Sequence, residues 1–240
     1  MKILSFDSTA KIASVAVCDG EELLALYNID NGLTQSELLL PMAENMLKAL
    51  KLTLRDIDLL AVSVGPGSFT GVRIGTAIVK GLAFGRDIPT VGVSTLDELA
   101  ENLRGLKGII VPCMDARRSQ VYNALFRSDG ESLTRLTEDR AISIADLAKE
   151  LSEYKGESIY LSGDGEAVAR EKLLALGQEL SVTPRLLIGQ NAYSVARVAY
   201  RKYLNGEYTN DLGISPTYLR MPQAERERLE KLNASQSGKE

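Results

Sequence analysis

Short apolar runs alternate with longer segments of helical periodicity along the first 104 residues. Strand-like runs come first, over residues 2–6, 12–18 and 23–29. Asp19-Gly20 separates the last two runs, and this dipeptide suits the positive φ angles of a two-residue hairpin turn. The pattern then predicts a helix over 34–50, a strand over 59–64, a helix over 70–84, a strand over 90–93 and a helix ending at 103.

The same order of elements recurs in the second half of the chain. Strands are predicted over 108–114, 120–126, 133–136, 158–161 and 185–188, and helices over 144–151, 166–176 and 192–204. Asp7 and Asp115 each follow the first strand of their half. The duplication predicts an α/β fold of two β-β-β-α-β-α halves, with mixed sheets flanked by helices and a cleft between the halves. We expect domains at 1–104 and 105–222, and a charged flexible tail over 223–240.

Composition narrows the chemistry of this fold. The 240 residues carry a net charge of −4 and no histidine. An acidic chain is not expected to bind nucleic acid on its own. Without histidine there is no His-x-x-x-His metal pair and no histidine-activated nucleophile, so we predict no catalytic group, metal or cofactor. Two cysteines in apolar runs and the lack of any long apolar segment favour a cytoplasmic protein with reduced thiols.

A glycine-rich turn is expected between the strand that ends at residue 64 and the next helix. It reads Gly65-Pro-Gly-Ser-Phe-Thr-Gly71 and lacks the Gly-Lys-Ser/Thr of a Walker loop. Two interpretations stay open. The N–H groups from Gly67 to Gly71 could bind an anion or a partner's carboxylate, or the segment could be a tight turn before a capped helix.

Two helices of the first half are unusual in composition. Helix 34–50 is apolar over more than one stripe, and Pro41 is expected to kink or loosen it. Helix 70–84 has glycines spaced for close helix packing. Both could pack on their own sheet or on a second protein. The candidate interface residues are Leu39, Met42, Met46, Leu50, Gly71, Ile74, Gly75 and Ile78.

A second candidate site is the cleft between the halves. Asp7 and Asp115 could hold a metal–nucleotide there, or they could be strand-end caps. Arg117 lies in Met114-Asp-Ala-Arg-Arg118 and suits phosphate or carboxylate, although it could equally be a solvated surface residue. Gly67 and Ser68 complete this set.

These residues resemble those of a known family. Gly65-Pro-Gly-Ser-Phe-Thr-Gly-Val-Arg-Ile-Gly75 is nearly the signature of the bacterial TsaB (YeaZ) family. Further matches are Ser36-Glu37-Leu-Leu-Leu-Pro41, Ser162-Gly-Asp-Gly165 and Pro216-Thr-Tyr-Leu-Arg220. The family usually has Asp-Thr-Ser at Asp7-Ser8-Thr9, His-Ser-Glu at Gln35-Ser36-Glu37 and Arg-Arg-Gly-Glu-Val-Tyr at Arg117-Arg118-Ser119-Gln120-Val121-Tyr122.

The resemblance implies the actin-like ATPase (ribonuclease H-like) fold and a role in making threonylcarbamoyladenosine, next to the anticodon of tRNAs that read codons beginning with adenine. TsaB proteins are similar to the TsaD transferase but inactive. The resemblance implies a TsaD-like partner bound through helices 34–50 and 70–84, a TsaE-like ATPase reached through the complex, a homodimer in the partner's absence, and only indirect contact with tRNA. A glycoprotease-like hydrolase and a nucleotide-binding module remain the alternatives.

Overall fold

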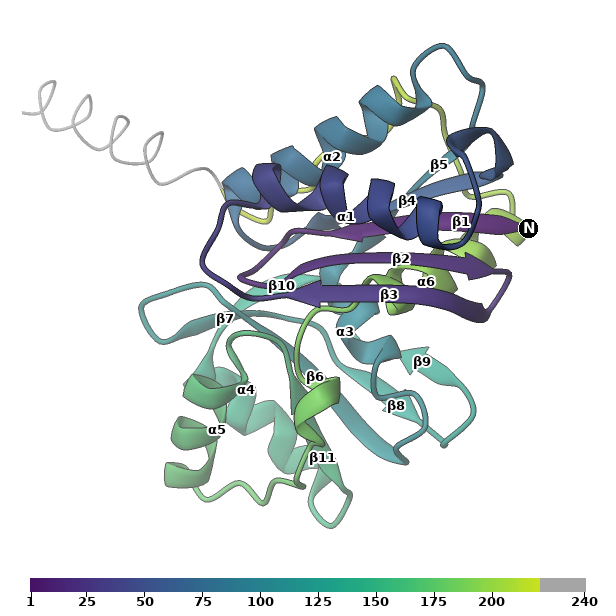
Figure 1. Cartoon of the computed structure of the whole chain (residues 1–240). Coiled ribbons are helices and arrows are strands. Elements are labelled where there is room, and N and C mark those ends of the chain that lie inside the picture. Colours follow the sequence, from purple (N-terminus) through teal and green to yellow (C-terminus); the bar gives the residue numbers. More distant parts are fainter. Residues whose placement is uncertain (221–240) are drawn as a thin grey trace, which may run out of the picture.

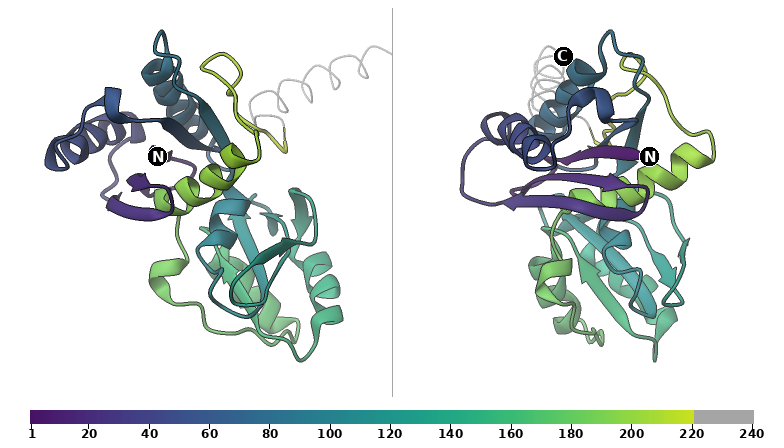
Figure 2. Two further views of the ribbon diagram at one scale, coloured as in Figure 1. Left: turned by 90° about the vertical axis from the view of Figure 1, so that its right-hand side faces the viewer. Right: turned by 45° about the vertical axis from the view of Figure 1, so that its right-hand side comes forward.

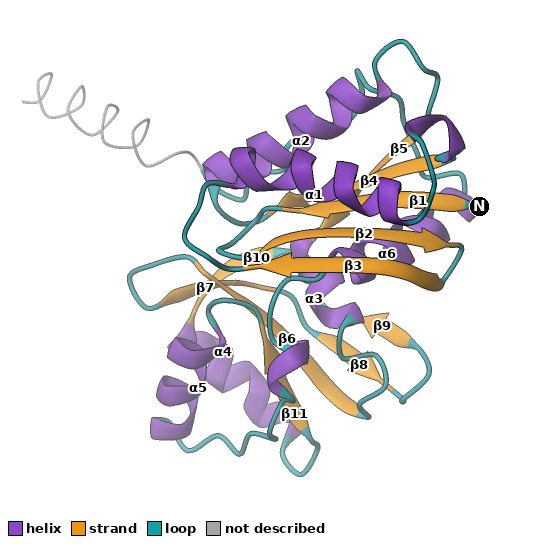
Figure 3. Cartoon of the chain, in the orientation of Figure 1, coloured by secondary structure: helices purple, strands orange, loops and turns teal. Residues whose placement is uncertain are grey.

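The computed structural model of the chain describes residues 1–220, and the predicted tail over 223–240 lies outside this range. Two sheets lie one above the other, with helices outside and between them (Figures 1 and 3). The first half holds a five-stranded sheet of order β3-β2-β1-β4-β5. Its strands are β1 (Lys2–Asp7), β2 (Ala13–Asp19), β3 (Glu22–Ile29), β4 (Leu59–Gly65) and β5 (Thr90–Ser94).

Both faces of this first sheet are covered by helices. β1, β4 and β5 run parallel. As in any β-strand, successive side chains of β1 point to opposite faces of the sheet. Leu4 and Phe6 pack under α1 (Gln35–Ala49) and α2 (Phe69–Ala83), whereas Ile3 packs against α6 (Ala192–Leu204) (Figure 2). The short helix η1 (Leu54–Asp56) precedes β4. α1 continues through Pro41 without interruption, so the loosening expected there does not break it.

The second half is built around β6 (Gly108–Asp115). Its sheet has the order β10-β7-β6-β8-β9, and β11 also pairs with β6, in parallel. α4 and α5 cover one face, and α3 packs on the other and against α6, between the sheets. The remaining elements are α3 (Thr95–Glu101), β7 (Gln120–Asn123), β8 (Phe126–Ser128), β9 (Leu133–Arg135), β10 (Arg140–Ser143), α4 (Ile144–Leu151), η2 (Ser152–Tyr154), β11 (Ile159–Ser162), α5 (Glu166–Ala175) and η3 (Arg185–Leu187).

Three predictions about the second half are wrong. Segment 120–126 forms two strands, because the Asn123 amide donates to Pro112 O and Ala124 O (2.9 and 3.1 Å) and interrupts the ladder. Segment 185–188 was predicted as a strand but is largely the 3₁₀ turn η3. In addition, no strand was predicted where β10 lies. α6 packs on the first sheet, so its assignment to a domain over 105–222 is incorrect. The boundary near residue 104 stays a prediction.

Candidate functional site

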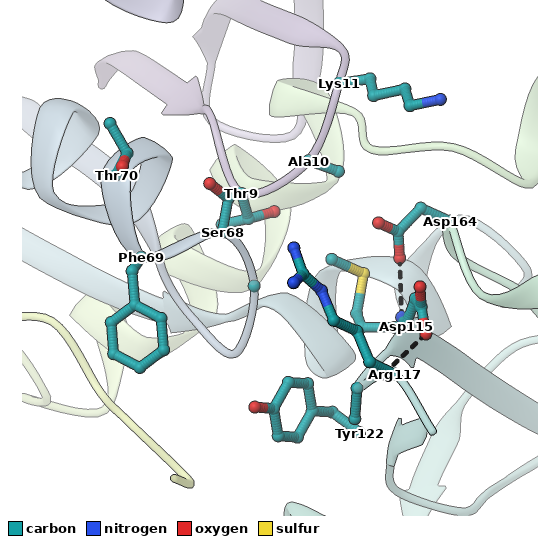
Figure 4. A pocket seen from close by; sticks show the side chains of 13 residues that line it. Thr9, Ala10, Lys11, Ser68, Phe69, Thr70, Asp115, Arg117, Tyr122 and Asp164 are labelled. Atoms are coloured by element: carbon teal, nitrogen blue, oxygen red, sulfur yellow. Dashed lines mark hydrogen bonds between the residues drawn. The ribbon is translucent and has the colours of Figure 1, made fainter. Parts of the chain in front are cut away.

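A cleft of about 500 Å³ separates the two halves (Figure 4). Gly67, Ser68, Asp115 and Arg117 of the predicted set line it. The first half forms one wall with the end of β1 and the start of α2, and the second half forms the other with the β6–β7 hairpin. Nine further residues line the cleft, and sequence reasoning did not select them as cleft residues; they include Thr9, Lys11, Phe69, Tyr122 and Asp164. Tyr122 and Asp164 belong to segments that the family resemblance had marked.

The glycine-rich turn is packed tightly against the end of β1. The Ser68 N–H donates to Thr9 O (2.7 Å), and the Gly71 N–H donates to Ser68 Oγ (3.3 Å). A Cβ atom on Gly67 would lie 2.5 Å from Thr9 O, and one on Gly71 would lie 1.8 Å from Ser8 O. These glycines therefore allow a close approach of two backbones. Of the two open interpretations, the geometry supports the tight turn before a capped helix.

Asp7 does not reach the cleft. Its side chain is fully buried and accepts hydrogen bonds from the N–H and the hydroxyl of Thr9 (3.0 and 3.1 Å). Of the two interpretations of Asp7, this geometry supports the strand-end cap and not a metal–nucleotide ligand shared with Asp115. The physical reason is local, because an aspartate at a strand end turns back to the N–H two residues on.

A second carboxyl group, that of Glu98 on α3, lies buried beside Asp7. It accepts hydrogen bonds from Ser63 Oγ (2.5 Å) and the Asn191 N–H (2.7 Å). Burial and then the neighbouring charge of Asp7 raise the pKa of Glu98 well above its usual range, and burial also raises the pKa of Asp7. Each of the two carboxyls therefore keeps its proton to a higher pH than an exposed carboxyl does. No pattern in the sequence indicated Glu98, because a glutamate in a short helix normally faces water.

The opposite wall of the cleft is polar and open. Asp115 Oδ1 accepts from the Arg117 N–H (2.8 Å), and Asp164 Oδ1 accepts from the Asp115 N–H (3.0 Å) (Figure 4). At the tip of the hairpin, Arg117, Arg118 and Ser119 all have left-handed backbones, with φ of 61°, 53° and 60°. Such residues are strained by roughly 1–2 kcal/mol each, which makes this tip unusual.

Ser119 has a lysine partner that the sequence did not reveal. Lys172 Nζ donates to Ser119 Oγ at 2.6 Å. The Lys172 side chain is half-buried. A lysine that activates a serine for hydrolysis must instead accept the proton.

Most of the predicted interface residues face their own sheet. Leu39, Met42 and Met46 lie in the core under α1, and Gly71 and Gly75 are buried against Ser8. The prediction that these five are open to a partner is therefore wrong. The periodicity of an apolar helix cannot say which side meets the sheet. Leu50, Ile74 and Ile78 are half-buried.

Another part of the helix pair is uncovered. Along α2, exposed Ala77 and Gly81 follow the half-buried Ile74 and Ile78 at helical spacing, and Phe84 at the end of the helix is 72% exposed. We call these five residues the α2 stripe. On the adjacent α1, Leu40 is 45% exposed. No helix within the described part of the chain is long and apolar enough to cross a bilayer.

Comparisons with known proteins agree with this architecture. The family model "TsaD: tRNA N6-adenosine threonylcarbamoyltransferase" matches residues 34–227. The chain is 30% identical to the tRNA threonylcarbamoyladenosine biosynthesis protein TsaB of Bacillus subtilis over 94% of this chain and 96% of that protein. It is 29% identical to TsaB of Escherichia coli over 92% and 95%. The chain belongs to the TsaB family.

Solved structures of similar proteins show the same fold. YeaZ from Pseudomonas aeruginosa superposes with a TM-score of 0.72 at 22% identity, over 91% of this chain and 99% of that one. A crystal structure described as similar to peptidase YEAZ, from the same species, gives 0.74 at 23% identity over the same shares. These matches and the sheet order confirm the predicted actin-like α/β fold.

Two departures from the usual TsaB pattern have visible structural roles. Gln35, where the family usually has histidine, donates from Nε2 to Ala10 O and Lys11 O (3.0 and 3.1 Å). It thereby holds the loop that forms one side of the cleft. Ser119 stands where the family usually has glycine, which explains a left-handed backbone at a serine.

Proposed function

We propose that this TsaB-family chain is a non-catalytic subunit that binds and activates a TsaD-type transferase. The transferase would make threonylcarbamoyladenosine next to the anticodon of tRNAs that read codons beginning with adenine. The observation that carries the proposal is the uncovered α2 stripe beside Leu40, on the outer face of the first sheet.

The α2 stripe has the shape that a helix of another protein needs. Ala77 and Gly81 are four residues apart and have almost no side chain, so a second helix can approach the backbone closely. Ile74, Ile78 and Phe84 surround them with apolar surface, which gains free energy when it is removed from water. A Cβ atom on Gly81 would meet nothing within 4 Å in this chain. The glycine therefore has no packing role inside its own subunit.

The cleft supports a subunit without catalysis of its own. The glycine-rich turn is closed by Thr9 and Ser8, and Asp7 is buried away from the space. Lys172 is a hydrogen-bond donor to Ser119. In the family pattern the reactive centre belongs to TsaD, and this chain would activate that transferase by binding to it. By the same pattern we propose a homodimer through the α2 stripe when the transferase is absent, and a TsaE-type ATPase reached through the complex.

A charge placed on the α2 stripe tests the proposal. Ala77→Glu should weaken binding to the TsaD-type protein of the same organism at least about tenfold, because a carboxylate would be buried unpaired in the interface. Ala167→Glu is the matched control, since Ala167 is an exposed alanine on α5 of the other half. Both variants should keep the circular dichroism of the wild type. Complex mass in solution measures binding, and an undiminished Ala77→Glu complex would refute the interface.

A further inference from the structure

Four cations near the mouth of the cleft have no carboxylate partner. Within residues 1–220, no Asp or Glu oxygen lies within 4 Å of the charged nitrogens of Arg73, Arg118, Lys172 or Arg220. Among the other arginines of residues 1–220, Arg55, Arg86 and Arg185 also lack a carboxylate within 4 Å, so this group is distinguished by its shared position and not by the lack of a partner. Seven arginines have such partners: Arg104, Arg127, Arg135, Arg140, Arg170, Arg197 and Arg201.

The first part of this cation group is joined by two tyrosines. Arg73 Nε donates to the hydroxyl of Tyr218 (2.8 Å). The Tyr218 ring, 40% exposed, stacks on Phe69 with a centroid distance of 4.8 Å. Two residues further on, Arg220 lies over the ring of Tyr122 at 5.7 Å. The segment 217–220 thus carries positive charge and aromatic surface from α2 to the second half.

The hairpin tip continues the same surface. Arg220 donates to Ala116 O (3.2 Å) and to the side-chain oxygen of Gln120, which are both uncharged acceptors. Arg118 is exposed at the tip between them, and Lys172 of α5 reaches Ser119. We call Arg73, Tyr218, Arg220, Arg118 and Lys172 the basic strip. Arg73 bonds to Tyr218, and Arg220 lies two residues further along the chain. Arg118 lies in the chain between Ala116 and Gln120, to which Arg220 bonds, and it precedes Ser119, to which Lys172 bonds.

The charges on this strip remain available to a ligand. Asp115 and Asp164 are nearby, but they line the cleft and accept backbone N–H groups on that side. The strip therefore concentrates four positive charges on a chain whose net charge is −4. The strained backbone of Arg118 and Ser119 presents this charge at the tip of the hairpin.

We infer that the basic strip contacts the phosphate backbone of RNA, with Tyr218 as a surface on which an unpaired base stacks. Guanidinium groups beside exposed aromatic rings are the chemistry of single-stranded RNA recognition. The choice of RNA over an acidic protein rests on the proposed function, which brings tRNA to the assembly. It replaces the expectation that tRNA is reached only through the partner.

Fluorescence anisotropy with a labelled, unmodified tRNA transcript and the isolated chain tests the inference. Four phosphate contacts on a single strand predict a slope near −2.8 in log affinity against log salt, so binding should weaken about 50-fold between 50 and 200 mM salt. Arg118→Glu should weaken binding about tenfold at 50 mM salt and lower the slope by about 0.7.

Arg55→Glu is the matched control. Arg55 is exposed on η1, which precedes β4, whereas the glycine-rich turn follows β4. Arg55→Glu changes the net charge by the same amount as Arg118→Glu. It should alter RNA affinity less than about twofold. Equal loss in both variants, or no salt-dependent binding by the wild type, would overturn the inference. So would displacement of RNA by poly-glutamate at equal charge, which would identify an acidic protein as the ligand.

The same variants separate this inference from the proposed function. Arg118→Glu should still form the complex with the TsaD-type protein, and Ala77→Glu should still bind RNA. RNA binding is measured on the isolated chain, so a failure of partner binding leaves its result unchanged.

Discussion

The two walls of the cleft are built in opposite ways. On the first wall, backbone meets backbone: Gly71 and Gly67 lie against the end of β1, and the carboxyls of Asp7 and Glu98 are buried behind them. On the second wall, the β6–β7 hairpin is exposed and charged. Its tip accepts hydrogen bonds from Lys172 and the Ile144 N–H at Ser119, and from Arg220 at Ala116 and Gln120.

This difference indicates that the first wall contributes to stability and the second to binding. A closely packed wall fixes the position of α2, and with it the orientation of the α2 stripe. A substitution there should cost stability. An exposed, charged wall contributes little to the fold, and a substitution there should change binding with little change in stability.

The largest effect is expected on the packed wall. In Gly71→Ala, the new methyl group would lie 1.8 Å from Ser8 O, so β1 and α2 must separate. We expect unfolding free energy to fall by about 3 kcal/mol, at the upper end for overpacking. Chemical denaturation followed by circular dichroism measures this. A loss below about 1 kcal/mol would mean that the turn has room to move and that the wall is not rigid.

The sequence was informative where one local interaction decides the structure. A hairpin joins β2 and β3 as predicted, but Asp19 is the last residue of β2, so the turn consists of Gly20 and Glu21, with a positive φ at Gly20. Glu37 accepts from the Thr34 N–H at 3.0 Å at the start of α1, as predicted. These contacts involve residues at most three positions apart. The duplicated order of elements also predicted two mixed sheets, because sheet order depends on the run of strands and helices.

The predictions from sequence failed where residues far apart in the chain determine the local structure. Asn123 interrupts a strand by bonding Pro112 O, eleven residues away, and Glu98 meets Asp7 only in the folded chain. The candidate interface failed for a related reason. Met46 and Leu40 are both apolar residues of α1, and only contact with the sheet distinguishes the buried one from the exposed one.

The buried acid pair gives the packed wall a pH dependence. Because burial raises the pKa of Glu98 in the folded protein, the contribution of this residue to stability is fully present below its ordinary pKa of about 4.5 and is lost as the pH rises toward the folded pKa. Glu98→Gln keeps the shape and never ionises. Relative to the wild type, it should gain unfolding free energy as the pH rises above about 4.5.

Thermal or chemical unfolding across that range measures the Glu98 effect. Glu44→Gln, at an exposed position of α1, is the control and should follow the wild-type profile. Parallel profiles for Glu98→Gln and the wild type would show that the pair retains no proton.

A glycine on the open side of the same helix should behave in the opposite way to Gly71. Nothing lies within 4 Å of a Cβ atom on Gly81, so Gly81→Ala should raise unfolding free energy by about 1 kcal/mol through helix propensity. The same methyl group would hold a partner helix away, so complex formation with the TsaD-type protein should weaken. A variant that is more stable and binds equally well would exclude close packing at Gly81.

The smallest effect is expected on the open wall. Ser119→Gly relieves a left-handed backbone, worth roughly 1 kcal/mol, but it gives the unfolded chain more freedom and removes the hydrogen bond from Lys172. These contributions nearly cancel, so we expect a change within about 0.5 kcal/mol. RNA affinity should stay within about twofold, because Arg118 and Lys172 keep their charges. A loss above about 1 kcal/mol in urea unfolding would show that the Lys172 contact stabilises the hairpin, and that the second wall is also packed for stability.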